Sequence, residues 1–426
     1  MQKHLITFLL AFCSFCYLDA QTINDSLRIT LPEAEKIFLD SNYQLLAQKY
    51  NIDAQKALII QARLYPNPNL SIARGPIIPL HNSDYPNSTF FSQSETSAQL
   101  SQIILLAGKR NKQVKLAEAN SRLGEFQFFD LMRTLKYTLR TDFFNIYYLQ
   151  QSLKVYHQEI TSLQKVVEAF VQQEGKGYIA EKEVVRIKAQ LYSLQNEYAQ
   201  LINQINDIES ELKLILQVKP QEYILPLADT DNINNLNPEK YPLNILMDSA
   251  YKNRTDLEIA RTNNEINRLN YSYQKALAVP DVTLSLGYDH QGSYAVNFQS
   301  LGASIDLPFF NRNQGNIKSA KAMIDYGTAL QKSTEATVSE NVTRSLQKAF
   351  DQNKLFRNID PKFSEDFERL MNEVLINYQK RNISILDFLD FYDSYKQNAL
   401  QINAIKFNKV GAFEDINFYT GTNFFN

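Results

Sequence analysis

The sequence predicts a mainly α-helical chain with a small β part, in which long antiparallel coiled-coil helices accompany two β-hairpins. Three observations support this prediction: an internal duplication, long stretches without helix-breaking residues, and short segments that alternate apolar with small or polar residues. In each repeat the predicted order is helix, strand, strand, long helix, helix. A short strand pair among very long helices is not typical of a water-soluble globular protein.

Matching segments show the duplication. The matches pair 64–71 with 278–285, 109–119 with 312–322, and 177–184 with 381–388. Such a repeat indicates one supersecondary unit that was duplicated and stacked on itself. We therefore expect a single domain, 21–426, made of two repeats at about 30–217 and 243–421. The proline-rich, polar segment 217–242 is expected to be an external connector between them.

The first twenty residues are typical of a secretory signal peptide. Lys3 and His4 form a short basic start, residues 5–15 are apolar, and Ala20 is a small final residue. We predict a signal peptide at 1–20 with cleavage before Gln21. The alternative, a buried first helix, fits less well with a basic residue at the extreme N-terminus.

Composition excludes several classes of site. Both cysteines, Cys13 and Cys16, fall within the signal, and Phe12 and Phe15 before them disfavour lipid attachment. The mature chain would then have neither disulfides nor thiolate metal sites. The formal net charge of −2 provides no basic surface for nucleic acid. No later stretch reaches the roughly 18 apolar residues of a spanning helix, so a membrane role would fall to the strands.

Glycine and proline are absent where long helices are expected. No proline occurs at 87–219 and no glycine at 178–286, and in a helix interior these residues cost about 3 and about 1 kcal/mol. The helix after the first hairpin is predicted from about Lys109 to Gln172, a length of roughly 90–100 Å. A helix this long needs support from coiled-coil packing.

Apolar residues three and four apart provide that support in both repeats. The clearest seam is Val184, Ile187, Leu191, Leu194, Tyr198, Leu201, Ile205, Ile208, Leu212 and Ile215. The second repeat has a looser version: Phe388, Phe391, Tyr395, Asn398, Ile402, Ile405, Lys409, Ala412, Ile416 and Tyr419. The helices on either side of 174–177 are expected to fold back as an antiparallel pair.

The predicted strands are apolar on one face only. In the second repeat the apolar positions are Val282, Leu284, Leu286 and Tyr288, then Leu301, Ala303, Ile305 and Leu307, with a turn at 289–293 between the two runs. The first repeat is weaker, with Leu70 and Ile72 facing Ala98 and Leu100. Segments of about 10 residues with this alternation suit an outer-membrane barrel. The alternative is an ordinary amphipathic sheet.

Two hairpins cannot close a barrel. Outer-membrane barrels start at about eight strands, and an open strand edge is not tolerated in lipid. We therefore expect several copies to pool their strands in one barrel. Because the helices continue directly from the strands, they should extend that barrel as a hollow cylinder.

With these features the chain resembles TolC-type outer-membrane efflux proteins, the outer membrane factors of tripartite pumps. The resemblance covers nearly everything after the signal. It is carried by the twofold repeat, by the segment 66–71 at the start of the first strand, and by the segment 307–317 after the last one. The second segment is close to the family pattern PLF-x-R-x-x-G-x-I and is the most diagnostic.

The resemblance implies a homotrimer with a twelve-stranded barrel and a twelve-helix periplasmic tunnel. It places the chain in the outer membrane of a Gram-negative bacterium, in contact with outer-membrane lipid and with a long periplasmic part. The implied partners are a periplasmic adaptor, or membrane fusion protein, and an inner-membrane transporter of the RND type. Overall size and the lack of large insertions fit the heavy-metal branch slightly better than the drug pumps.

In this family the helix hairpins at the far end of the tunnel close it. Tyr378, Asp387 and Asp390 match the second tip motif. The two aspartates are three residues apart and share a helix face, so each would form a ring of carboxylates in a symmetric trimer. Such a ring attracts cations and repels itself, which suits a gate. The alternative is two solvated acids in the first turn of a helix, where the macrodipole favours them.

Further tip residues follow from the same resemblance. Glu183 stands where an acidic partner of the tip tyrosine is expected, and we predict a Tyr378–Glu183 hydrogen bond. Arg381 replaces the family's glycine, which Gly177 keeps in the first tip, so we expect a different second turn and an Arg381 that pairs with an acid. The expected adaptor contacts are Gly177, Tyr178, Ile179, Asn382, Ile383 and Ser384, whose alternative is a plain interhelical turn.

Catalytic chemistry is not expected. His81, His157 and His290 have no metal-ligand spacing, and no nucleophile–base set or phosphate-binding glycine loop is present. We predict a passive, non-enzymatic channel without cofactor or metal. Two alternatives stay open. One is an exit duct for type I protein secretion, and the other is a soluble secreted coiled-coil scaffold, which would not explain the alternating strands.

Overall fold

The computed structural model describes residues 26–75, 95–291, 295–360 and 362–425. The predicted signal peptide with both cysteines, and most of the connection in the first hairpin, lie outside these residues. Among the helices in the described ranges, none combines the length and the apolar character needed to cross a membrane.

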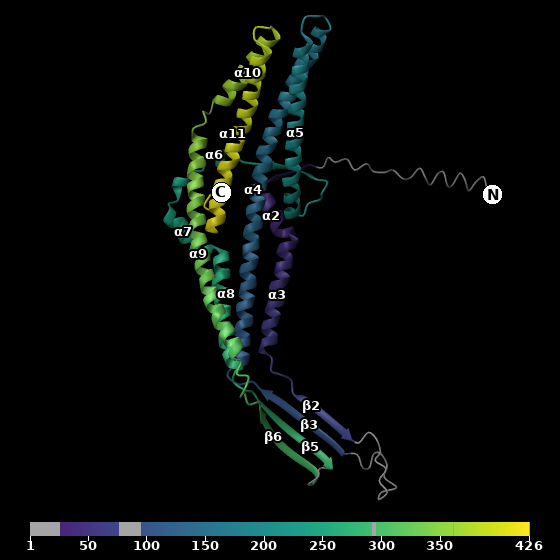
Figure 1. Cartoon of the computed structure of the whole chain (residues 1–426), viewed down its shortest axis with the longest axis vertical. Coiled ribbons are helices and arrows are strands. Elements are labelled where there is room, and N and C mark those ends of the chain that lie inside the picture. Colours follow the sequence, from purple (N-terminus) through teal and green to yellow (C-terminus); the bar gives the residue numbers. More distant parts are fainter. Residues whose placement is uncertain (1–25, 76–94, 292–294, 361, 426) are drawn as a thin grey trace, which may run out of the picture. The chain divides into compact units, whose positions relative to one another are not determined.

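The predicted element order occurs twice (Figure 1). The first repeat contains β1 (Ser26–Thr30), α2 (Leu31–Ser41), α3 (Tyr43–Arg63), β2 (Asn69–Gly75), β3 (Glu95–Ile104), α4 (Lys109–Glu174) and α5 (Glu181–Leu216). The connector and second repeat contain β4 (Tyr223–Leu227), α6 (Thr230–Asn234), η2 (Pro238–Lys240), α7 (Leu243–Asn253), α8 (Thr255–Leu277), β5 (Val282–Gln291), β6 (Val296–Ile305), α9 (Gln314–Arg357), α10 (Phe363–Gln379) and α11 (Ile385–Thr420).

Two long helices correspond in the repeats but differ in continuity. The helix predicted at 109–172 is confirmed as α4, with 66 residues. Its counterpart in the second repeat is divided, because α9 ends at Arg357 and α10 begins at Phe363. Residues that lie between them include Pro361, and proline disfavours helical conformation in the residue before it.

The described residues form two compact units. One unit comprises residues 1–45, 132–253 and 340–426, and the other comprises 46–131 and 254–339. Each repeat contributes matching segments to both units, and α4 and α9 pass from one unit into the other. That the two repeats together make a single domain stays a prediction.

The unit formed by 46–131 and 254–339 contains an antiparallel sheet with the order β2-β3-β5-β6. Leu70, Leu100, Leu286 and Leu301 are directly paired across the four strands, so they form one row on one face. All four leucines are exposed, Leu301 by 81%. The predicted alternation and the pairing of the first hairpin are confirmed. Strand β6 ends at Ile305, so Leu307 lies beyond the strand to which we assigned it.

The opposite face of this sheet consists of small and polar residues. The paired row next to the leucines is Ser71, Gln99, Gly287 and Ser300. A Cβ atom on Gly287 would lie 2.5 Å from the Ser300 Oγ, so the serine hydroxyl would have to move to another position. The glycine therefore allows β5 and β6 to place the serine on this face without a clash.

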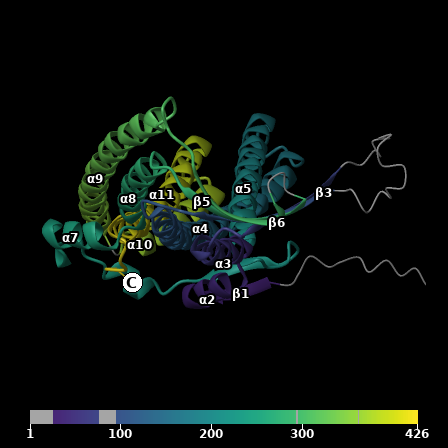
Figure 2. The same cartoon turned by 90° about the horizontal axis from the view of Figure 1, so that it is seen from below.

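Helices α3, α4, α8 and α9 lie side by side in this unit, in that order (Figures 1 and 2). Ion pairs such as Arg122–Glu265, at 2.6 Å, join neighbouring helices but are exposed and worth little. One pair is better shielded: Lys109 Nζ lies 2.7 Å from Asp281, with the lysine side chain 6% exposed. It ties the start of α4 to the residue that precedes β5.

In the other unit, a buried arginine joins three helices. Arg140 of α4 donates through Nε and Nη2 to both carboxylate oxygens of Glu414 in α11, at 2.6 and 2.7 Å. Its Nη1 donates to Glu35 of α2, at 2.6 Å. This bidentate geometry is the strong form of a charge-assisted pair. Strands β1 and β4 form a parallel pair in the same unit, so the connector is fixed to the N-terminal strand.

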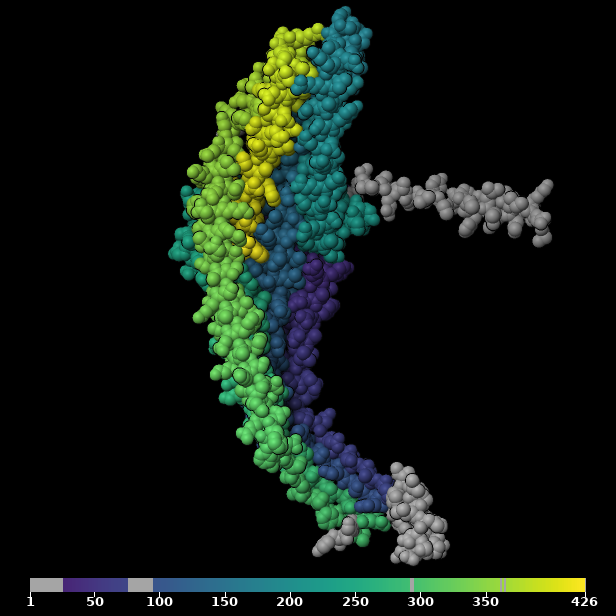
Figure 3. Space-filling model, viewed as in Figure 1, coloured from purple at the N-terminus to yellow at the C-terminus, as the bar shows by residue number. Residues whose placement is uncertain are grey.

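The ends of α4, α5, α10 and α11 share one apolar core (Figure 3). It consists of Tyr156, Leu163, Val166, Phe170, Val184, Ile187, Leu191, Leu194, Met371, Tyr378, Phe388 and Tyr392. The start of the α5 seam is therefore confirmed. The α4–α5 pair and the α10–α11 pair pack together as two hairpins.

The seam that we predicted at the start of α11 is partly wrong. Phe388 is buried in the core as predicted, but the next buried residues are Tyr392 and Lys396, whereas Phe391 and Tyr395 are only partly buried and pack against the core. The rings of Phe391 and Tyr395 also contact Phe367 of α10, with centroid distances of 5.1 and 5.4 Å. Helix α11 packs on two sides at once, so one stripe of apolar residues does not describe its burial.

The shared core predicts that Ile187→Ala destabilises the hairpin tips. Ile187 is fully buried and Val185 is 58% exposed on the same helix. We expect a loss of about 2–5 kcal/mol for the buried site and less than about 0.5 kcal/mol for Val185→Ala. Denaturant unfolding of the two variants measures the difference, and equal losses would contradict this core.

Candidate functional site

The two turns that contain the predicted site residues have the same backbone conformation. Gly177 and Arg381 both adopt left-handed φ angles, of 74° and 63°. The following N–H group in each turn donates to a carbonyl five residues back, from Tyr178 to Gln173 and from Asn382 to Asn377, each at 2.9 Å. Both are Schellman ends. The expectation of a different second turn is therefore wrong.

Arg381 connects the two hairpins. Its Nη2 donates to the Gln173 side-chain oxygen at 3.1 Å and to the Tyr178 carbonyl at 2.9 Å. Both acceptors are neutral, so the expected pairing with an acid is also wrong. A non-glycine residue in this backbone region costs roughly 1–2 kcal/mol, which the two charge-assisted bonds offset in part. The side chain gains contacts with the first tip that glycine cannot make.

Asp387 caps the helix that follows the second turn. Ser384 donates from its hydroxyl to Asp387 Oδ2 at 2.6 Å and from its N–H at 3.3 Å, while the Asp387 N–H donates to Ser384 Oγ at 3.2 Å. This reciprocal arrangement is a capping box. Asp390 lies three residues further on and is exposed. The carboxylate rings that would need other copies stay a prediction.

Tyr378 is a core residue rather than a surface partner. It is 4% exposed, stacks on Phe388 with ring centroids 4.3 Å apart, and contacts Phe170 at 5.1 Å. Its hydroxyl is buried, with no hydrogen-bond partner in the described ranges. The predicted bond to Glu183 is thus wrong, although burial, followed by the Glu183 charge, raises the pKa of Tyr378.

The predicted adaptor contacts divide into two groups. Gly177, Tyr178, Asn382 and Ser384 are exposed at the turns. Ile179 and Ile383 are only partly exposed, because they pack against the shared core. The isoleucines therefore anchor the turns, and the exposed residues are the ones available to a partner. Contact with an adaptor stays a prediction.

A polar layer that the sequence pattern did not indicate lies inside this core. Lys396 of α11, with its side chain 3% exposed, lies 2.9 Å from Glu197 of α5 and 3.0 Å from Asp393. Tyr156 of α4 also donates to Glu197, at 3.1 Å. The spacing of four between Phe388, Tyr392 and Lys396 is the signal that could have revealed it.

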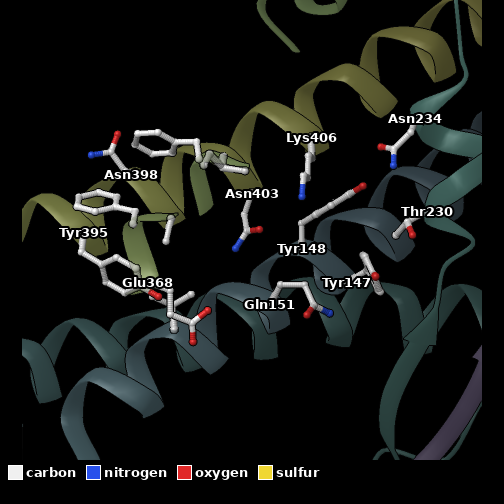
Figure 4. A pocket seen from close by; sticks show the side chains of 15 residues that line it. Tyr147, Tyr148, Gln151, Thr230, Asn234, Glu368, Tyr395, Asn398, Asn403 and Lys406 are labelled. Carbon is white, nitrogen blue, oxygen red and sulfur yellow. The ribbon is translucent and has the colours of Figure 1, made fainter. Parts of the chain in front are cut away.

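A pocket of about 390 Å³ lies among α4, α6, α10 and α11 (Figure 4). Its walls include Tyr147 and Tyr148 on α4, Tyr395 and Lys406 on α11, and Glu368 on α10. The side chain of Lys406 extends toward Tyr148 in this view. In the described part of the chain, no cluster of three or more His, Cys, Asp or Glu residues could hold a metal ion.

Part of the chain is similar to a known protein family. Residues 36–216 match the model of the family described as "Outer membrane efflux protein". The chain is 20% identical over 362 residues to the cobalt-zinc-cadmium resistance protein CzcC of Cupriavidus metallidurans, covering 85% of this chain and 82% of that protein. The resemblance stated from the sequence is confirmed.

Solved structures share the fold over nearly the whole chain. The CmeC outer membrane channel of Campylobacter jejuni has a TM-score of 0.73 and 14% identity, covering 92% of this chain and 86% of that one. CusC has a TM-score of 0.73 and 15% identity, covering 96% of both chains. The predicted fold class, with long helices and a small strand part, is confirmed.

The unpartnered Tyr378 hydroxyl predicts that Tyr378→Phe leaves the stability unchanged or slightly higher. An unsatisfied buried hydroxyl costs free energy, whereas the ring stacking on Phe388 is retained. Tyr378→Ala, which removes the ring, should cost about 3–5 kcal/mol. Denaturant unfolding measures the stability of both variants. A clear loss of unfolding free energy in Tyr378→Phe would show that the hydroxyl makes a stabilising interaction.

The capping box predicts that Ser384→Ala frays the start of α11, at a cost of about 1 kcal/mol. Asp390→Asn, in the same turn region but outside the cap, should have no such effect. Hydrogen exchange of residues 385–389 measures the fraying. Equal exchange in Ser384→Ala and in the unaltered chain would show that the cap contributes nothing.

Proposed function

Because residues 36–216 match the outer membrane efflux protein family, we propose that this chain is the passive outer-membrane channel of a tripartite efflux system. It carries small substrates to the exterior, after an inner-membrane transporter of the RND type and a periplasmic adaptor have delivered them. The channel itself has no enzymatic activity, so the energy for transport comes from the inner-membrane partner.

The observation that carries this proposal is the four-stranded sheet. One face presents an exposed leucine row, and the other presents serine, glycine and glutamine. Strands β2 and β6 each lack a partner on their outer side within the described residues. Three copies that join β6 of one to β2 of the next would close a barrel, with leucines toward lipid and small polar residues toward the lumen.

Metal cations are the substrate class that we favour. The similarity to CzcC, a protein named for cobalt, zinc and cadmium resistance, extends over 85% of this chain and supports this class. The alternative of an exit duct for type I protein secretion receives no comparable support. A soluble coiled-coil scaffold would leave the exposed leucine face without a purpose.

The two hairpin turns form the periplasmic gate in this proposal. Arg381 holds the second turn to Gln173 and Tyr178 of the first, and Asp387 and Asp390 contribute acidic rings in the trimer. An adaptor that binds the exposed turn residues would compete for the same carbonyl and amide oxygens. Binding would thereby release the tether and open the tip.

The proposed channel predicts a detergent-extractable trimer in the outer-membrane fraction that forms pores in planar bilayers. Expression of the full chain, followed by fractionation, heat-dependent gel migration and conductance recording, tests this. A water-soluble monomer without conductance would overturn the proposal.

The tether predicts that Arg381→Gly raises the pore conductance several-fold. Glycine keeps the left-handed turn but removes both bonds to the first tip. Lys380→Ala is the matched control, because Lys380 is exposed and adjacent to Arg381. Single-channel recording of both variants provides the measurement. A conductance for Arg381→Gly that equals the control would show that Arg381 does not restrain the gate.

A further inference from the structure

A polar layer crosses the shared core of the two hairpins. We use this name for Tyr156, Glu159, Glu197, Tyr392, Asp393 and Lys396. Lys396 bonds to Glu197 of the first hairpin, and the Tyr392 hydroxyl donates to the backbone carbonyl of Glu159, also in the first hairpin. These two bonds run from α11 to α5 and to α4. The layer therefore holds the hairpins in register at a level separate from the Arg381 tether.

Glu159 is the anomalous member of the layer. The residue is 5% exposed, and its Oε2 atom has no hydrogen-bond partner in the described ranges. The cation that acts on its charge, Lys396, is already paired with two other carboxylates, Glu197 and Asp393. A further negative charge at Glu159 would give the layer one ammonium and three carboxylates. A buried carboxylate is costly when one of its oxygens is unpartnered and no cation pairs with it alone.

Other groups around Glu159 do not supply the missing positive charge. The groups of α11 that interact with it, besides Lys396, are the uncharged phenols of Tyr392 and Tyr395. The charged group that α10 places near Tyr395 is Glu368, another acid. Consistent with this setting, burial raises the pKa of Glu159 to about 7, against the opposing effects of Tyr392 and Lys396.

The direction of the pH effect follows from this raised pKa. An unfolded or separated hairpin releases the Glu159 proton near the ordinary value of 4.5, whereas the packed layer keeps it until about 7. The stabilising contribution of the protonated form is thus fully present below about 4.5 and is lost as the pH rises through about 7. Ionisation at higher pH favours states in which water reaches Glu159.

We propose that the polar layer is a pH-sensitive clasp between the two hairpins, tight when Glu159 is protonated and loosened when it ionises. The clasp itself follows from the packing of α4, α5 and α11. Its consequence, easier opening of the tunnel tip at higher pH, rests on the proposed channel function.

Hydrogen exchange of the purified full chain in detergent tests the clasp directly. The variants are Glu159→Gln, a neutral mimic of the protonated acid, and Glu168→Gln, a matched control at an exposed position of the same helix. At pH about 8, peptides covering 155–163 and 392–398 should exchange at least about tenfold faster in the unaltered chain than in Glu159→Gln, after correction for intrinsic rates. At pH about 4, below the ordinary value of 4.5, the two should be nearly equal.

The control variant should follow the unaltered chain at both pH values. Equal exchange of the unaltered chain and Glu159→Gln at pH about 8 would overturn the clasp, and so would a difference of the same size at both pH values. Bilayer recordings of the same proteins separate the two proposals. If no protein forms a pore, the channel function fails, while the exchange data still decide the clasp.

Pore formation with an open probability that rises with pH in the unaltered chain, but not in Glu159→Gln, would support both proposals. Pores whose pH response is the same in the two proteins would overturn the link between the clasp and the gate. In that case the proposed channel function would stand, but Glu159 would not control its opening.

Discussion

Unpaired strand edges are the constraint on which the rest of this structure depends. The described sheet has four strands, and its outer strands β2 and β6 each present a row of backbone N–H and C=O groups without a partner in the sheet. In water such edges invite association, and in lipid they are not tolerated. One face of this sheet is an exposed row of leucines. By joining copies of itself at the outer strands, the chain can pair these edges and turn the leucines toward lipid.

The hairpin tips obey a different constraint. Their core is apolar, yet the groups that link one hairpin to the other are polar: Arg381 at the turns, and Tyr392 and Lys396 further along α11. Apolar contacts are non-directional, so they hold the helices together without defining a unique register. Hydrogen bonds from a few positions add directional contacts that define how the two hairpins align.

Duplication explains both the symmetry and its exceptions. The two turns share the Schellman backbone, with Gly177 in one and Arg381 in the other. The repeats diverge where the second long helix is divided between α9 and α10. That division lets α10 present Phe367 to α11, which gives α11 its second packing side. The functional asymmetry of the tips thus comes from changes at a few positions.

The sequence by itself determined the periodic parts: the long helix from about Lys109 to Gln172, the α5 seam from Val184 to Leu194, and the apolar face of the strands. These features repeat at two, three or four residues, and local geometry turns such spacing into a face. Only the tertiary structure decided that Tyr378 is stacked without a hydroxyl partner in the described residues, that Arg381 bonds to neutral oxygens, and that Lys396 pairs with Glu197. Those outcomes depend on which atoms distant segments bring within about 3 Å, and residue spacing carries no information about that.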